Sequence, residues 1–112
     1  MAAAGPPDLF DDVVFTRRLM LAGSDDPVVV EIGRPLPLGD RRGYRCPYRI
    51  LGLGKDILGF GAGADEIHAL MLTLNKIGAF LYTSPAYQEG RLHWMEAGGR
   101  NLGFPMPEAA GD

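Results

Sequence analysis

The sequence predicts an α+β domain in which one long amphipathic helix packs on one face of an antiparallel sheet of four to five strands, in the order β-β-β-β-α-β. Three observations predict this fold. Four segments with the character of strands come first and are separated by turn residues. One segment with a helical period follows, and a short final alternation closes the pattern. Strands grouped together and followed by a helix favour packing of that helix across the sheet.

Two strands open the pattern and form a hairpin. Residues 13–22 place Phe15, Leu19 and Leu21 on one face, with Thr16 and Arg18 on the other. Residues 23–27 are turn-forming by composition, and residues 28–33 alternate again as a second strand. The two segments are therefore expected to pair antiparallel.

The third strand shows the clearest alternation. Over residues 44–53, one face carries Tyr44, Cys46, Tyr48 and Ile50, while arginines and Pro47 occupy the other. Because proline donates no ladder hydrogen bond, this strand should lie at an edge, bulge at Pro47, or direct the missing donor outward. Residues 57–61 return as a fourth strand.

Residues 65–82 change to the period of a helix. Its apolar arc contains the residues Ile67, Leu70, Met71, Leu74, Ile77, Gly78 and Leu81. We expect the helix to dock on the sheet through Leu70, Leu74, Ile77 and Leu81, with Ala69 and Thr73 on the polar side. The helix ends before Pro85, and residues 91–95 form a last strand with Leu92 and Trp94 on one face.

Length and composition fit one domain. The chain has 112 residues, of which 46% are hydrophobic and 22% charged, as in an ordinary globular protein. We expect a single domain over residues 9–107, between disordered tails at residues 1–8 and 108–112 that are small, proline-bearing and acidic. The start of the chain lacks a secretory signal pattern, and no apolar run approaches the roughly 18 residues that span a bilayer. The chain is therefore not expected to bind membranes. Because it has one cysteine, and so no internal disulfide, we expect it in the cytoplasm.

The glycine-rich stretch at residues 52–63 raises the question of a phosphate site. Residues 59–64 match the G-x-G-x-x-G/A pattern in front of the helix, where anions can bind. A dinucleotide fold also needs parallel βαβ units and an acidic residue about 20 positions later, and the sequence offers neither. A hairpin turn, a helix start and close packing of helix on sheet explain these glycines instead, so no cofactor is expected.

No catalytic or metal site emerges. His68 and His93 are the only histidines and form no metal-binding pair. The single cysteine, Cys46, faces the predicted core, where a thiol is normally inert. Neither Ser24 nor Ser84 lies in a nucleophile elbow. The sequence therefore predicts a protein that is not an enzyme.

An arginine-rich sheet face is the candidate ligand site. Residues 13–54 contain seven arginines and four acidic residues, in a chain whose net charge is −3. Arg17, Arg45 and Arg49 are the residues that would contact an anion or small ligand. The overall charge does not favour nucleic acid, and the tyrosines that alternate with these arginines share the face of Cys46 and Ile50, so they are expected in the core rather than stacked on bases.

Leu72 and Phe80 are the candidate interface residues. Both lie on the polar side of the predicted helix, and the second face of the sheet has no helix to cover it. Apolar surface of this kind is buried by a partner, and a two-fold contact between identical chains is the commonest solution. We therefore expect a homodimer or a protein partner.

Five segments together resemble a family of small bacterial proteins known only as a domain of unknown function. They are FTRRLML, VVVEIGRP, YRCPYRILGLG, GADEIHALMLTLNKIGAFLY and NLGFP. The resemblance covers roughly residues 13–105 and implies a bacterial origin and a compact α+β domain. It implies no active site.

Two functions from different classes remain. The first is a non-enzymatic interaction module that acts as a homodimer or binds a protein partner. The second is a small-ligand or anion-binding domain that uses the arginine-rich sheet face. A concave arrangement of Arg17, Arg45 and Arg49 would favour the second, and a flat apolar contact through the helix or sheet would favour the first.

Overall fold

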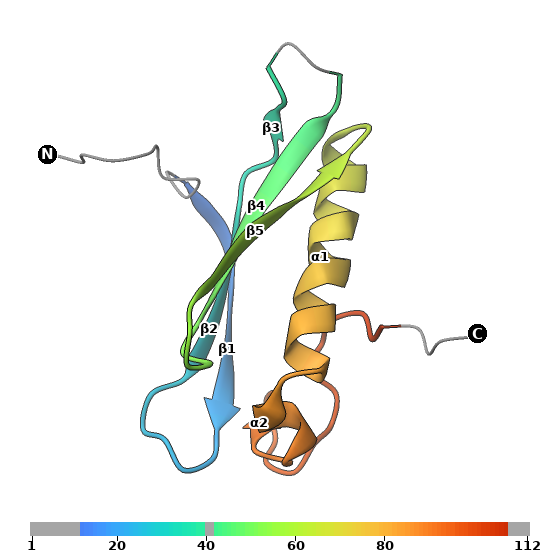
Figure 1. Cartoon of the computed structure of the whole chain (residues 1–112). Helices are drawn as coiled ribbons and strands as arrows, with labels where there is room; N and C mark the ends of the chain where they lie inside the picture. The colour runs from blue at the N-terminus through green and yellow to red at the C-terminus, as the bar shows by residue number, and fades with distance from the viewer. Residues whose placement is uncertain (1–11, 40–41, 108–112) are drawn as a thin grey trace, which may run out of the picture.

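The predicted α+β architecture is confirmed by the computed structural model, which describes residues 12–39 and 42–107 (Figure 1). Its elements are, in chain order, β1 (Val13–Leu21), β2 (Val28–Gly33), β3 (Leu36–Pro37), β4 (Tyr44–Leu51), β5 (Ile57–Gly63), α1 (Glu66–Tyr82), α2 (Pro85–Gln88) and β6 (Leu92–His93). The strands form one antiparallel sheet in the order β3-β4-β2-β1-β6, and β5 pairs with β4. The tails predicted at residues 1–8 and 108–112 lie outside the described residues.

Two short elements were not predicted. The strand β3 falls within a stretch rich in proline and glycine, and it pairs with β4 only through Leu36 and Pro37. The helix α2 begins at Pro85, directly after the predicted end of the long helix, and the Ser84 side chain caps it by accepting the Tyr87 N–H at 3.2 Å. Proline at the first helical position ends one helix and starts the next.

Pro47 lies inside the sheet and not at its edge. The strand β4 pairs with β5 along one side, and with β3 and β2 along the other. Pairing with β3 uses Tyr44 and Arg45, and pairing with β2 begins at Tyr48. Pro47 therefore lies in the gap between these two partners, where a missing N–H interrupts no ladder.

The face that α1 buries differs from the predicted one. Ile77, Gly78 and Leu81 are buried as expected, but Leu70 and Leu74 are only half-buried. Ile67 and Met71 are 69% and 56% exposed. Ala69 and Thr73, which were expected on the polar side, are completely buried. The helix is thus rotated about its axis relative to the sequence prediction.

The reason for this rotation is the contact between α1 and the glycines of β5. A Cβ atom at Gly61 would lie 2.5 Å from the Thr73 nitrogen, and one at Gly63 would overlap the backbone at Ala69. The absence of these side chains lets the helix backbone approach the strand closely. Small residues on both elements therefore decide which side of α1 faces the sheet.

The Thr73 hydroxyl reinforces this contact by joining the two strands beneath the helix. It accepts the Gly61 N–H at 2.8 Å and donates to the Cys46 carbonyl at 2.5 Å. Cys46 and Gly61 are partners in the β4–β5 register. A helix side chain thus bridges a pair of strand residues in the buried core.

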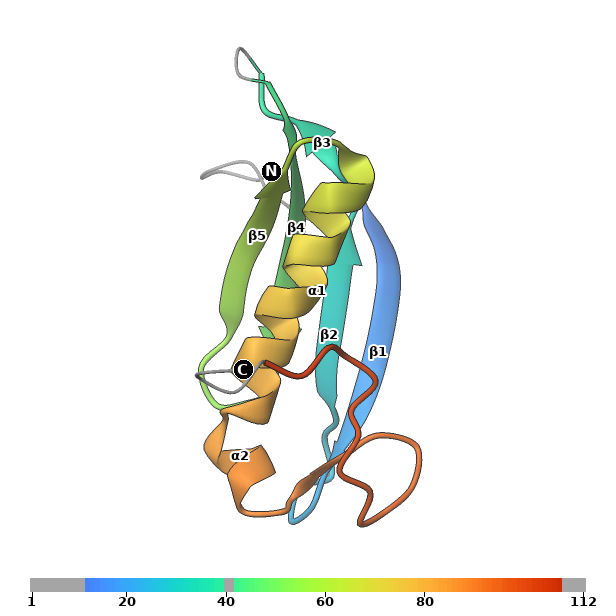
Figure 2. The ribbon, with the colours of Figure 1, turned by 90° about the vertical axis from the view of Figure 1, so that its right-hand side faces the viewer.

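The carboxyl-terminal segment completes the core beside α1. Leu92, Leu102 and Phe104 are buried, and the Tyr82 hydroxyl accepts the Leu102 N–H at 3.0 Å and donates to the Phe104 carbonyl at 3.1 Å. In Figure 2 this segment crosses the sheet near β1 and β2, while α1 covers β4 and β5. Two different elements therefore share the task of covering the sheet.

We predict that Ile77→Ala lowers the free energy of unfolding by about 2–5 kcal/mol, because it truncates a completely buried side chain. Met71→Ala is the matched control on the same helix, and it should cost less than about 1 kcal/mol since Met71 is exposed. Urea denaturation measures both. Equal losses for the two variants would contradict the observed orientation of α1.

We predict that Thr73→Val costs about 2–4 kcal/mol, because it leaves the buried Gly61 N–H and Cys46 carbonyl without their partner. Thr73→Ser keeps the hydroxyl and serves as the matched control, with a smaller loss. Urea denaturation of both variants provides the comparison. A valine variant as stable as the serine variant would show that the bridge contributes nothing.

Candidate functional site

The three arginines predicted to contact a ligand are not brought together. Arg17 pairs with Val30 in the β1–β2 register and faces α1. Arg49 faces the other side of the sheet, where its Nε lies 2.5 Å from the Glu31 carboxylate. Arg45 shares that face, and its buried Nε has no hydrogen-bond partner among the described residues. An anion role for this face stays a prediction, and no concave arrangement of the three supports it.

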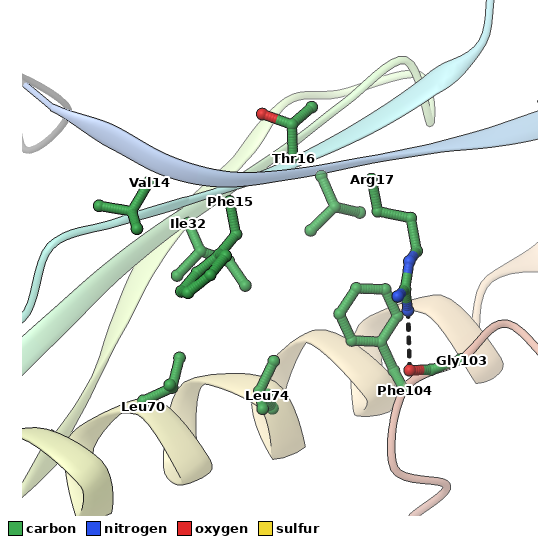
Figure 3. Close-up of a pocket in the computed structure, with 10 residues that line it drawn as sticks. Val14, Phe15, Thr16, Arg17, Ile32, Leu70, Leu74, Gly103 and Phe104 are labelled. Carbon is green, nitrogen blue, oxygen red and sulfur yellow. Dashed lines mark hydrogen bonds between the residues drawn. The ribbon is translucent and has the colours of Figure 1, made fainter.

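Arg17 occupies a half-buried position between aromatic rings. Its guanidinium carbon lies 4.0 Å from the centre of the Trp94 ring and 4.8 Å from that of Phe104. One terminal nitrogen donates to the Gly103 carbonyl at 2.8 Å (Figure 3) and lies 3.4 Å from that of Leu102. Among residues 12–39 and 42–107, no carboxylate forms an ion pair with it. Burial lowers the pKa of Arg17, which indicates that its positive charge has lost part of its hydration.

A groove of about 470 Å³ runs beside Arg17, between β1 and α1. Its lining includes Val14, Phe15 and Ile32 from the sheet, Leu70 and Leu74 from the helix, and Phe104 from the carboxyl-terminal segment. Figure 3 shows the sheet residues facing the two leucines across the open space. We call this feature the β1–α1 groove. The sequence did not predict this groove, because Leu70 and Leu74 were expected in the core. The large apolar side chain of Phe15 on the first strand could have indicated it.

The candidate interface residue Phe80 lies at the opposite edge of the sheet. It is exposed, and its ring centre is 6.5 Å from that of Tyr48. Leu58 and Phe60 of β5 line the same shallow depression, and Leu58 is 58% exposed. We call Leu58, Phe60 and Phe80 the β5-edge patch. Leu72, the second candidate, is half-buried and does not line this depression.

The glycine-rich stretch forms the hairpin and the helix start that the sequence favoured. The turn at residues 52–56 joins β4 to β5. Two N–H groups in front of α1 are already bonded, since Gly61 donates to Thr73 and Ala64 donates to His68 Nδ1 at 2.9 Å. The Asp65 side chain caps the helix by accepting the His68 N–H at 2.8 Å. Protein groups therefore occupy donors that a phosphate would need.

The groups with catalytic potential are separate from one another. Cys46 is buried, and burial raises the pKa of its thiol. His68 lies at the start of α1, whereas His93 lies on β6 with its Nδ1 3.2 Å from the Gly99 carbonyl. Within the described part of the chain, no group of His, Cys, Asp and Glu side chains could hold a metal ion.

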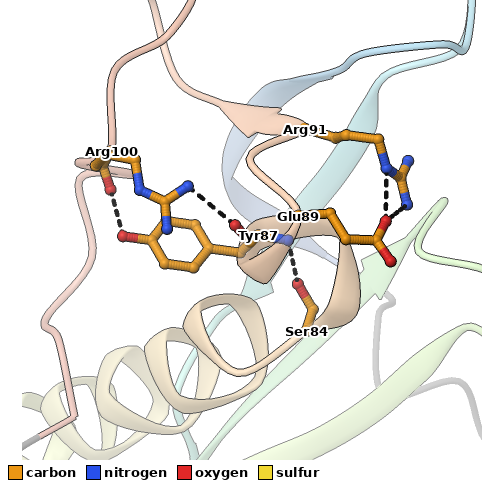
Figure 4. A network of polar contacts seen from close by, with 5 residues as sticks. All are labelled: Ser84, Tyr87, Glu89, Arg91 and Arg100. Carbon is orange, nitrogen blue, oxygen red and sulfur yellow. Dashed lines mark hydrogen bonds and ion pairs between the residues drawn. The ribbon is translucent and has the colours of Figure 1, made fainter.

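A polar network around α2 fastens the last loop to the domain (Figure 4). The Arg100 guanidinium stacks on the Tyr87 ring at 3.9 Å and donates to the Tyr87 carbonyl at 3.0 Å. The Tyr87 hydroxyl donates in return to the Arg100 carbonyl at 3.0 Å. Glu89 and Arg91 form an exposed ion pair nearby. This network fixes the chain just before Leu102 and Phe104, which lie next to Arg17. We therefore assign the network a structural role.

Comparison with known proteins identifies the family. The model of a domain of unknown function, DUF6968, matches residues 15–106. The chain therefore belongs to the DUF6968 family, which confirms the expected membership of a domain of unknown function. No curated protein and no solved structure matches it. In the part of the chain that the structure describes, no helix is long and apolar enough to cross a membrane.

We predict that the glycine stretch binds no nucleotide. Calorimetric titration with ATP, GTP and NAD at millimolar concentration should give no saturable heat, because the nearby N–H groups of Gly61 and Ala64 are already bonded. Saturable micromolar binding that Gly61→Ala or Gly63→Ala abolishes in a folded variant would contradict the hairpin interpretation. Circular dichroism of each variant provides the folding control, since a Cβ at either position would push α1 from β5.

Proposed function

We propose that this member of the DUF6968 family is a non-enzymatic interaction module that acts as a homodimer. The observation that carries the proposal is the β5-edge patch, where Leu58, Phe60 and Phe80 lie exposed around one shallow depression. Large apolar side chains gathered at one place on a surface mark contacts between proteins. The patch joins the open face of the sheet to the exterior of α1, two surfaces that the sequence suggested separately.

A second copy of the chain fits the charge of this patch. Lys76 is the one basic residue in its lining, and its ammonium donates to the Phe60 carbonyl at 3.0 Å. No acidic side chain lines the depression. An apolar surface whose cation is already bonded to its own chain can pack against itself, because neither copy then buries an unbonded charge.

The same lysine indicates how the two copies meet. β5 pairs with β4 alone among the described strands, so its other side is a sheet edge. Lys76 covers the Phe60 carbonyl on that edge, and charged side chains at edges disfavour pairing with another strand. We therefore expect side chains, rather than a continuous sheet, to form the contact.

The chemistry of the described residues supports a role without catalysis. The one thiol is buried and its pKa is raised, which is the inert state of a cysteine. The two histidines lie on different elements and bond to the backbone. We also place the protein in the cytoplasm, where a free buried thiol of this kind is common.

We predict that the chain has about twice its monomer mass of 12.1 kDa in light scattering at tens of micromolar. Phe60→Glu and Phe80→Glu should each return it to the monomer mass, because a carboxylate would be buried in an apolar contact. Ile67→Glu is the matched control, since Ile67 is exposed on a different side of α1. A monomer throughout this range, or a dimer that neither substitution affects, would refute the proposed contact.

A further inference from the structure

The β1–α1 groove exists because no described element covers the inner face of β1 near its start. The helix α1 packs on β5 and β4, and in Figure 2 β1 lies beyond β2 from the helix. The carboxyl-terminal segment covers the far end of β1 with Phe104 and Leu102. Near the beginning of β1, Phe15 remains 52% exposed, although its register partner Ile32 is buried.

A bulge in β1 increases the apolar surface of the groove. Val13 pairs with Gly33 and Phe15 pairs with Ile32, so Val14 is an extra residue on this strand. Figure 3 shows the Val14 and Phe15 side chains both on the helix side, with Thr16 pointing away. Bulges redirect side chains in this way and occur often beside functional sites. Regular alternation would place only one of these two consecutive side chains in the groove, whereas the bulge places both there.

Among the described strands, only β6 pairs with the edge of β1 beside the groove, so most of that edge has no described partner. β6 pairs with β1 only at Met20 and Leu21. The Ala22 N–H points to that same side, because it donates to the Arg91 carbonyl at 2.8 Å. By the alternation of a strand, the backbone groups of Arg18 and Thr16 point out of this edge as well. An extended chain placed there would continue the line of β6.

One end of the groove is already occupied by a bent segment of this chain, around Gly103 and Phe104. Arg17 donates to the Gly103 carbonyl, and Tyr82 bonds to the backbone of Leu102 and Phe104. These contacts recognise main-chain groups of a peptide lying between β1 and α1. Beyond Phe104, the space of about 470 Å³ is unfilled.

The charge of the groove selects the partner's chemistry. Arg17 is half-buried at its end, bonded to carbonyls, and no carboxylate among residues 12–39 and 42–107 pairs with it. The other lining side chains are apolar except Thr16, which points away (Figure 3). A carboxylate would form a charge-assisted hydrogen bond with this guanidinium. An acidic side chain flanked by apolar ones therefore complements the groove.

We propose that the β1–α1 groove binds an extended segment of a protein partner, which pairs with the edge of β1 beside it, packs apolar side chains against Phe15 and Leu70, and places an aspartate or glutamate against Arg17. Such addition of a strand to a sheet edge is a recurrent mode of peptide recognition, in which backbone bonds supply affinity and side-chain pockets supply specificity. This site lies on the opposite edge of the sheet from the proposed dimer contact, so each can fail without the other.

The test selects random peptides displayed on phage against the immobilised full-length chain and measures the synthetic peptides by fluorescence polarisation. We expect enriched sequences with apolar residues at alternate positions and one Asp or Glu. Phe15→Ser should weaken binding about tenfold or more, because it removes a wall of the groove. Leu36→Ser, which truncates an exposed apolar residue of β3 that lines neither the groove nor the β5-edge patch, should leave binding unchanged.

Two further comparisons isolate the strand pairing and the charge. Thr16→Pro removes an N–H that points out of the edge, while the N–H groups of β1 that bond to β2 are kept. It should therefore weaken peptide binding. N-methylation of the peptide backbone should weaken binding for the same reason. Replacing the peptide's Asp or Glu by Asn or Gln should weaken binding to the native chain but not to Arg17→Gln.

Absence of any enriched sequence, or binding that Phe15→Ser and Thr16→Pro leave intact, would overturn the proposal. Conversion of a dimer to a monomer by Phe15→Ser would also overturn it, by assigning the groove to a second copy of the chain.

Discussion

The close contact between α1 and β5 determines most of this structure. Gly61 and Gly63 offer no side chains, so the helix backbone at Ala69 and Thr73 lies directly on the strand. The Thr73 hydroxyl then bonds to both β5 and β4. A buried hydroxyl with both partners satisfied fixes a helix more specifically than apolar contact alone, because any displacement leaves polar groups unpaired. The helix is thereby held over one side of the sheet.

The uncovered start of β1 is a consequence of that position. A single helix held on β5 and β4 leaves the inner face of β1 for the carboxyl-terminal segment, which reaches it through Leu102 and Phe104. Arg17 and Tyr82 hold this segment by its backbone. The segment contacts β1 at Arg17, and the apolar residues Phe15, Leu70 and Leu74 line an open groove beside it. The contact that orders the core thus also leaves this apolar groove open.

Sequence patterns predicted the class of fold well and the helix orientation poorly. Alternation in β1, β2 and β4 and the period of α1 depend on local geometry, which a sequence displays directly. Hydrophobicity could not distinguish Ile67 and Met71, which are exposed, from Ile77, which is buried, because all three lie in one apolar arc. The glycines spaced two apart in β5 held the missing information, since they mark where a backbone can approach. Alternation alone separates Arg17 from Arg49, since Arg17 shares the face of Leu19, whereas Arg49 lies on the face opposite Ile50. The sequence therefore already held this information.

The two edges of the sheet differ in a way that bears on function. Lys76 of α1 covers the Phe60 carbonyl on the β5 edge, a common protection against unwanted strand pairing. On the β1 edge, β6 pairs only with Met20 and Leu21, and the strand itself carries a bulge at Val14 and the charged residues Arg17 and Arg18. An edge that no described strand pairs over most of its length, lying beside an apolar groove, exposes a protein to aggregation unless a partner occupies it. The contrast between a guarded edge and an open one within the same small sheet therefore argues that β1 is kept open for binding.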